Sequence, residues 1–112
     1  MKLIECYVQP YNLDIVCEQL ILAGARGVSV SEVKGFGVQR GFKPSEGAHA
    51  GVKLLPKLKV ETVVGDDEVE GVIEKFSKAL NTGHVGEGKI FVYDVQDAVR
   101  IRTGERGEAA IK

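Results

Sequence analysis

Apolar and polar side chains alternate in the run Leu58-Lys59-Val60-Glu61-Thr62-Val63-Val64, which Gly65 terminates. A period of two is typical of a strand that turns one face toward a core. Asp66 follows, and its carboxylate can cap a helix whose positive end also favours the acidic residues after it. Apolar residues then recur at helical spacing, at Val69, Val72, Ile73, Phe76 and Leu80, and a stop follows at Asn81 and Gly83. This region therefore predicts a strand over 58–64 and a helix directly after it.

The same succession of strand and helix precedes this region. Residues 3–8 predict a strand, with one face formed by Ile4, Cys6 and Val8. A helix is expected next, with Asn12 as its N-terminal cap and Gly24 at its end. Tyr11 and Val16 are expected to form a hydrophobic staple around the cap. Its apolar positions are Leu13, Val16, Leu20 and Ala23. Residues 28–33 and 90–95 predict two further strands.

The resulting order is β-α-β-β-α-β, which predicts a ferredoxin-like α+β fold with two helices on one face of an antiparallel sheet. The strands carry apolar residues on both sides, so the second sheet face needs a cover, and self-association would supply one. The segment 35–57 has no clear period. A segment of this kind in so small a domain is usually functional.

The composition excludes several classes of function. The chain has 112 residues, 44% of them hydrophobic, which is typical of a single domain over 1–112. A net charge of −1 gives no basic surface for nucleic acid, and aromatic residues make up only 6% of the chain, with no tryptophan. No apolar run is long enough to span a membrane, and the start lacks a signal peptide, so a cytoplasmic location is expected. Cys6 and Cys17 do not form a C-x-x-C motif, and Cys6 is expected to be a buried, inert thiol.

Two groups of residues are candidates for anion binding. Residues 83–89 match G-x-x-x-x-G-K, but Ile90 replaces the magnesium-binding hydroxyl of a nucleoside-triphosphate loop, and a helix precedes the loop instead of following it. The amides of Gly86 and Gly88 and the Lys89 ammonium could still bind an anion, although a plain tight turn is the alternative. No set of nucleophile, base and acid is recognisable, so no enzymatic activity is expected.

The second group lies in the polar tail 97–112, where an alternation predicts Val99 and Ile101 inward and Arg100 and Arg102 outward. Arginines on one face suit bidentate contacts to phosphate or carboxylate. A solvated edge strand is the alternative reading of the same pattern.

Three runs resemble the PII signal-transduction proteins, the nitrogen regulatory family: 32–37 (Glu-Val-Lys-Gly-Phe-Gly), 82–92 and 100–111. The resemblance covers the whole chain. It implies a ferredoxin-like homotrimer that binds ATP or ADP in clefts between subunits, and a T-loop, here about 36–55, that docks onto a membrane transporter or a metabolic enzyme. A transporter partner would recruit the protein to the membrane, and the charge balance described above leaves no nucleic-acid partner expected.

The resemblance also implies ligand contacts by position. Those to the nucleotide fall on Gly35, Phe36, Gly37, Val38, Gln39, Val64, Gly86, Glu87, Gly88, Lys89, Arg100 and Arg102. Arg100 and Arg102 would reach it from the neighbouring subunit. Gln39 and a nucleotide-bound Mg²⁺ would together bind 2-oxoglutarate. Lys57 would pair with a carboxylate of that ligand, and Gly86 would lie beside it.

The departures from the family lie almost wholly in the T-loop. Val38 stands where an arginine is usual, and the usual Tyr-Arg-Gly-Ala-Glu-Tyr stretch is replaced by residues 45–50 in a loop that looks one residue shorter. No tyrosine lies between 36 and 57, so nucleotidylation is not expected there and Ser45 is the only hydroxyl left. The chain is therefore identified as a divergent member. The alternatives are a PII-like regulator of bicarbonate or carboxysome metabolism, a small phosphate-handling enzyme and an RNA-binding module of the same topology.

Overall fold

The computed structural model describes residues 1–36, 53–81 and 88–112. In chain order its elements are β1 Lys2–Val8, η1 Pro10–Asn12, α1 Leu13–Leu22, β2 Ser29–Gly35, β3 Leu55–Val64, η3 Asp66–Glu68, α2 Val69–Leu80, β4 Ile90–Asp94 and α3 Glu108–Ile111. Within the described residues, no helix is long and apolar enough to cross a bilayer.

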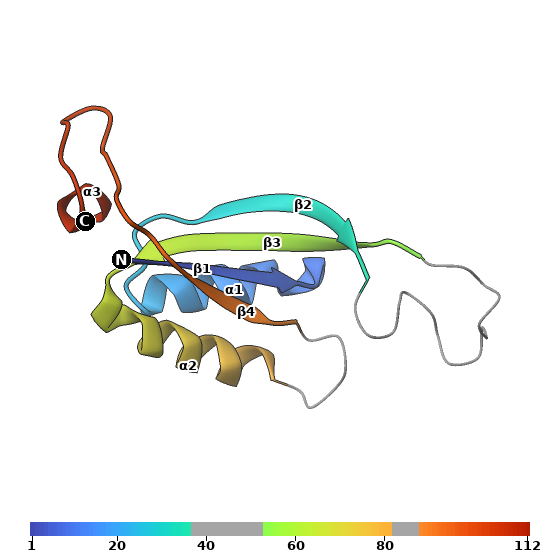
Figure 1. Cartoon of the computed structure of the whole chain (residues 1–112). Helices are drawn as coiled ribbons and strands as arrows, with labels where there is room; N and C mark the ends of the chain where they lie inside the picture. The colour runs from blue at the N-terminus through green and yellow to red at the C-terminus, as the bar shows by residue number, and fades with distance from the viewer. Residues whose placement is uncertain (37–52, 82–87) are drawn as a thin grey trace.

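The strands form one antiparallel sheet in the order β2-β3-β1-β4 (Figure 1). Cys6 of β1 lies opposite Val60 of β3 and Ile90 of β4, which fixes the register on both sides of the central strand. Helices α1 and α2 pack together on one face of this sheet. The ferredoxin-like α+β fold predicted from the order of elements is therefore confirmed.

The core lies between the sheet and the two long helices. It is formed by Ile4, Cys6, Val8, Val16, Leu20, Leu58, Val60, Val64, Val69, Val72 and Phe76. These positions follow the predicted periods, since alternate residues of β1 and β3 meet one row of side chains from each helix. The odd-numbered residues of β1 and β3 therefore face the opposite side of the sheet, which we call the open face.

Three local expectations were wrong at the helix starts. Asn12 does lie at the N-cap of α1, but its side chain makes no cap hydrogen bond, because Asn12 ends the 3-10 turn that begins at Pro10. Tyr11 is consequently exposed and forms no staple with the buried Val16. Asp66 does not cap α2 either, because it lies in the 3-10 turn η3 that precedes the helix. Gly24 does follow the end of α1, with φ at +94°.

Strand β3 begins earlier than the sequence indicates. Leu55, Pro56 and Lys57 pair with the last residues of β2, so part of the segment predicted as loop is sheet. The described strands leave residues 36–54 between β2 and β3, close to the predicted T-loop of about 36–55. Proline is tolerated here because position 56 lies near the end of the ladder.

The two thiols differ in their surroundings. Cys6 is buried, and its desolvation, with a smaller effect of the Glu5 charge, raises the pKa of the thiol to about 12. Cys17 is partly exposed on α1. The inert character expected of Cys6 therefore has a physical basis in burial.

We expect iodoacetamide at pH 8 to alkylate Cys17 and to spare Cys6 in the folded protein. With its raised pKa, on the order of one Cys6 thiol in ten thousand is ionised at that pH, and the core excludes the reagent. Peptide mass spectrometry after a short reaction would measure this, with guanidinium-unfolded protein as the control in which both thiols react. Equal alkylation of both thiols before unfolding would contradict the assignment.

Candidate functional site

One end of the sheet gathers several of the predicted ligand residues. Gly35 ends β2, Lys57 lies near the start of β3, and Gly88 and Lys89 immediately precede β4. The register places these positions together at the end of the sheet where β1 finishes at Val8 (Figure 1). We call this the loop end of the sheet. Phe36 continues from it and is half exposed.

The backbone of Gly88 lies very close to the backbone of β1. Its φ is +108°, and a Cβ atom placed on it would lie 2.2 Å from the carbonyl oxygen of Tyr7. Only glycine fits this combination of conformation and space. Gly88 and Lys89 also line a cavity of about 330 Å³ whose other walls include Tyr7, Phe76 and Leu80.

Arg100 and Arg102 lie at the opposite end of the molecule, and not on one extended face. Val99 pairs with Arg106 across a turn, in which the Arg100 amide donates to the Glu105 carbonyl oxygen. The predicted inward orientation was wrong, because Ile101 is 97% exposed and Val99 is 53% exposed. The segment turns back on itself at 101–103, which breaks the alternation that an extended strand would keep.

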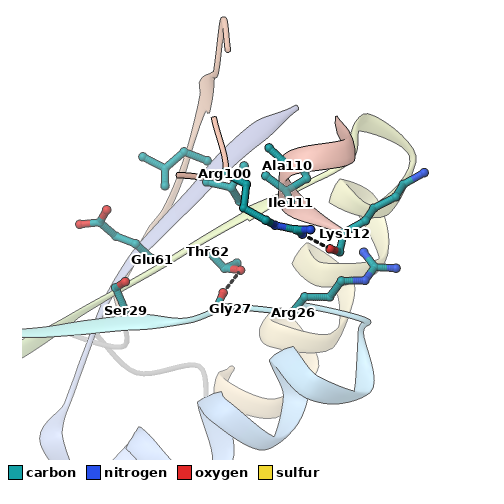
Figure 2. A pocket seen from close by; sticks show the side chains of 11 residues that line it. Arg26, Gly27, Ser29, Glu61, Thr62, Arg100, Ala110, Ile111 and Lys112 are labelled. Atoms are coloured by element: carbon teal, nitrogen blue, oxygen red, sulfur yellow. Dashed lines mark hydrogen bonds between the residues drawn. The ribbon is translucent and has the colours of Figure 1, made fainter. Parts of the chain in front are cut away.

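Arg100 points back toward the short helix α3. Its guanidinium donates to the Glu105 carboxylate at 2.9 Å. It also donates to the main-chain carbonyl of Lys112 (Figure 2). Arg102 is exposed and, within the described part of the chain, has no ion-pair partner. The sequence predicted neither the turn between Val99 and Arg106 nor the helix α3 in this polar tail.

Arg100 lines a cavity of about 400 Å³ near the start of β1, which we call the arginine cavity (Figure 2). Its walls come from Leu3, Arg26, Gly27, Ser29, Glu61, Thr62, Val63, Ala110, Ile111 and Lys112. The Thr62 hydroxyl donates to the Gly27 carbonyl oxygen at 2.6 Å and joins the turn before β2 to β3. The cavity therefore combines apolar walls with a carboxylate, a serine hydroxyl and guanidinium groups.

Sequence reasoning missed most of these residues and named Val64, which does not line the arginine cavity. Its side chain is 2% exposed and packs in the core. Its neighbour Val63 lines the cavity together with Glu61 and Thr62, so the lining takes residues from both sides of β3. Alternation in 58–64 alone therefore could not separate Val63 from Val64 as cavity residues.

The open face carries a polar network at its centre. Glu5 is only 6% exposed, and its carboxylate accepts from the Tyr93 hydroxyl at 2.8 Å and pairs with Lys59 at 3.3 Å. Lys59 also pairs with Glu61 at 3.0 Å. The hydrogen bond to Glu61 has the largest effect in raising the pKa of Lys59, and the hydrogen bond to Glu5 has the next largest. The Tyr7 and Phe91 rings meet edge to face beside this network. Glu5 is thus a nearly buried charge held by partners from both neighbouring strands.

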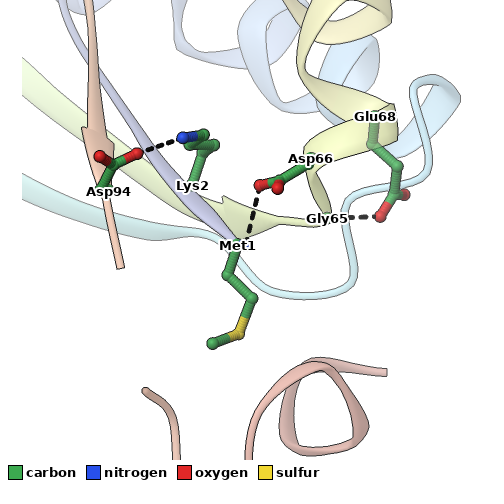
Figure 3. Close-up of polar contacts among 6 residues, drawn as sticks. All are labelled: Met1, Lys2, Gly65, Asp66, Glu68 and Asp94. Atoms are coloured by element: carbon green, nitrogen blue, oxygen red, sulfur yellow. Dashed lines mark hydrogen bonds and ion pairs between the residues drawn. The ribbon is translucent and has the colours of Figure 1, made fainter. Parts of the chain in front are cut away.

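Polar contacts fix the start of β1 between β4 and the turn after β3 (Figure 3). The Met1 amino group donates to the Asp66 carboxylate at 2.9 Å, which lowers the pKa of that carboxyl group. Lys2 pairs with Asp94, and the Gly65 amide donates to the Glu68 carboxylate at 3.0 Å. These contacts hold the strands that border the arginine cavity.

Several predicted site residues lie outside the described residues: Gly37, Val38, Gln39, Ser45, Gly86 and Glu87. Within residues 1–36, 53–81 and 88–112, no group of three or more histidine, cysteine, aspartate or glutamate side chains could hold a metal ion. Tyr7 and Tyr93 lie in strands, and Tyr11 lies in η1.

Comparisons with known proteins cover nearly the whole chain. The family model described as Nitrogen regulatory protein P-II matches residues 1–105. A nitrogen regulatory protein P-II from Mesorhizobium japonicum is 51% identical over 112 residues, which span 99% of this chain and 100% of that protein. The nitrogen regulatory protein GlnK of Escherichia coli K12 is 46% identical over the same shares of both chains. The chain belongs to the nitrogen regulatory protein P-II family, whose members are signalling proteins that interact with target proteins.

Proposed function

We propose that this protein binds ATP or ADP in clefts between the subunits of a homotrimer and regulates a transporter or metabolic enzyme through its T-loop. It acts in the cytoplasm as a non-enzymatic sensor of energy and of carbon and nitrogen status. The observation that carries the proposal is that the anion-binding candidates form two separate clusters at opposite ends of the sheet.

The distance between the clusters supports binding between subunits. Lys89 precedes β4 and Arg100 follows it, so the whole strand Ile90–Asp94, roughly 16 Å long, separates them. One phosphate group cannot contact both residues within one chain. A second copy that placed its Arg100 and Arg102 beside the loop end of the first would complete the site.

The open face supports self-association. Phe91 and Tyr93 are half exposed there, beside the nearly buried Glu5. Large apolar side chains beside polar groups that already have hydrogen-bond partners are typical of an interface between subunits. Helices α1 and α2 cover only the other face, so the open face is the side of the sheet available to another copy.

The two clusters suit different parts of a nucleotide. Gly88 and Lys89 offer a close backbone approach and a cation, which suit phosphates. The arginine cavity offers apolar walls for a flat base, and its Glu61 carboxylate can accept hydrogen bonds from an amino group. Its volume of about 400 Å³ falls within the range of small-molecule pockets.

We propose 2-oxoglutarate as the second ligand, bound with Mg²⁺ and ATP at Gln39 and Lys57. Lys57 supports this proposal because its strand brings it to the loop end, where its ammonium can pair with a carboxylate. Bicarbonate is the alternative effector, suggested by the altered residues of the T-loop.

Lys89→Ala is expected to weaken ATP and ADP binding by about 1.5–3 kcal/mol, because it removes a charged hydrogen-bond donor. Arg102→Ala is expected to weaken binding from the other side of the cleft. Isothermal titration would measure both, and sedimentation velocity would establish whether each variant remains a trimer. Lys75→Ala, on helix α2 away from both clusters, is the control that should bind normally. Unchanged ATP and ADP affinities in both site variants would refute the assignment, and release of ADP from ATP would favour the enzyme alternative.

We expect 2-oxoglutarate to tighten binding of ATP in the presence of Mg²⁺ by about 5–150-fold, the range of typical coupling between linked ligands. Thermodynamic linkage requires ATP to tighten 2-oxoglutarate binding by the same factor. Lys57→Ala should abolish the coupling and leave nucleotide binding in the absence of 2-oxoglutarate intact. Equal ATP affinity with and without 2-oxoglutarate would exclude this effector, and a parallel titration with bicarbonate would test the alternative.

A further inference from the structure

The outward side of α1 is unusually apolar. The exposed residues of α1 are Asp14, Ile15, Glu18, Ile21 and Leu22, and together with Tyr11 of the preceding turn η1 we call them the α1 outer face. Ile21 is 68% exposed and Leu22 is 62% exposed. Single exposed apolar residues are ordinary, but a group of them on one helix indicates a contact surface.

Helical spacing arranges these residues in two adjacent rows. Positions 15, 18 and 22 of α1 follow one another by three and four residues, and positions 14, 18 and 21 by four and three. Residues 13, 16 and 20 lie on the opposite side of the helix and pack into the core. The α1 outer face is therefore not a continuation of the core.

The charges on this face have one sign. Asp14 and Glu18 flank the apolar residues, and α1 contains no lysine or arginine. The nearest basic residue along the chain is Arg26, which lies beyond the helix and pairs with Glu68 at 3.9 Å. A second copy of α1 would bring like charges together, and an anionic membrane would repel the same carboxylates.

We propose that the α1 outer face is a docking surface for a basic amphipathic helix of a partner protein. The apolar side of such a helix would cover Ile15 and Leu22, and its lysines or arginines would pair with Asp14 and Glu18. Helix α1 has ten residues and is roughly 15 Å long, which is long enough for contact with a short partner helix. It lies on the side of the sheet away from the open face (Figure 1), so the trimer proposed above, formed through the open face, would leave it accessible.

A fluorescent amphipathic peptide built from leucine and lysine would test this proposal by anisotropy titration with the full chain. The double variant Ile15→Ser/Leu22→Ser is expected to lose at least about tenfold in affinity, because it removes two side chains from the buried contact. Glu18→Lys should weaken binding through charge repulsion. Ile101→Ser, an exposed isoleucine at the other end of the molecule, is the matched control and should bind like the wild type.

Circular dichroism would establish that every variant is folded before its affinity is compared. Equal affinity of the double variant and the wild type would overturn the proposal, as would equal binding of a leucine–glutamate peptide. Cosedimentation of the wild type with vesicles of anionic phospholipid, lost in the double variant, would instead assign the face to a membrane. Self-association that the double variant abolishes would assign it to a second copy.

Discussion

Gly88→Ala is expected to destabilise the fold and to displace the loop before β4. An added Cβ atom would lie 2.2 Å from the Tyr7 carbonyl oxygen, which belongs to the backbone of the central strand and cannot move aside alone. The backbone at φ +108° adds strain of about 1–2 kcal/mol for any residue other than glycine. Together we expect a loss of about 3 kcal/mol or more in the free energy of unfolding, measured by urea denaturation.

Gly71→Ala provides the matched control. Gly71 lies within α2, and a Cβ atom placed on it would meet nothing within 4 Å. The same substitution should therefore stabilise the protein by about 0.5–1 kcal/mol through improved helix propensity. If the two glycine-to-alanine substitutions change the free energy of unfolding in opposite directions, the effect at Gly88 comes from its position in the structure. If Gly88→Ala leaves the free energy of unfolding unchanged, the close approach of Gly88 to the Tyr7 carbonyl oxygen is wrong.

Phe76→Ala is expected to cost about 3–5 kcal/mol of the free energy of unfolding, because the substitution leaves a large cavity between α2 and the sheet. Phe76 is 1% exposed and is among the largest fully buried side chains. For a domain of this size the melting temperature should fall by roughly 10–20 °C. Calorimetry or thermal circular dichroism would measure the change.

Tyr11→Ala removes an aromatic ring of similar size from a position that is 81% exposed. Its effect on stability should stay within about 0.5 kcal/mol, as for most surface substitutions. A comparable loss of stability in both variants would contradict the assignment of Phe76 to the core.

Local patterns were sufficient to predict the architecture. The alternation in 58–64 and the helical spacing from Val69 to Leu80 each arise from the geometry of one element and its burial, so a single segment carries the whole signal. The stop at Gly24 was equally local, because its positive φ requires a residue without a side chain. The resemblance of three runs to the P-II family agreed with this fold and is confirmed by the family match over residues 1–105.

The predicted cap hydrogen bonds are absent because they depend on the backbone geometry at each helix start. Asn12 occupies the N-cap of α1 but ends the 3-10 turn η1, whereas Asp66 begins the 3-10 turn η3 and lies before Glu68, the N-cap of α2. The free energies that separate a cap from a 3-10 turn are small, and neighbouring contacts decide between them. Asp66 instead accepts from the Met1 amino group, a partner 65 positions away that no local pattern could indicate.

The sequence by itself determined the order of strands and helices, the core positions, and the glycine and lysine before β4 as an anion-binding candidate. The tertiary structure decided which residues share a site. Val63 lines the arginine cavity while Val64 enters the core, and Arg100 turns back toward α3 at the end of the sheet opposite Lys89. The physical reason is that periodicity is set within one segment, whereas a cavity is built from side chains of β1, β3 and the tail, whose proximity depends on pairing and turns far apart in the chain.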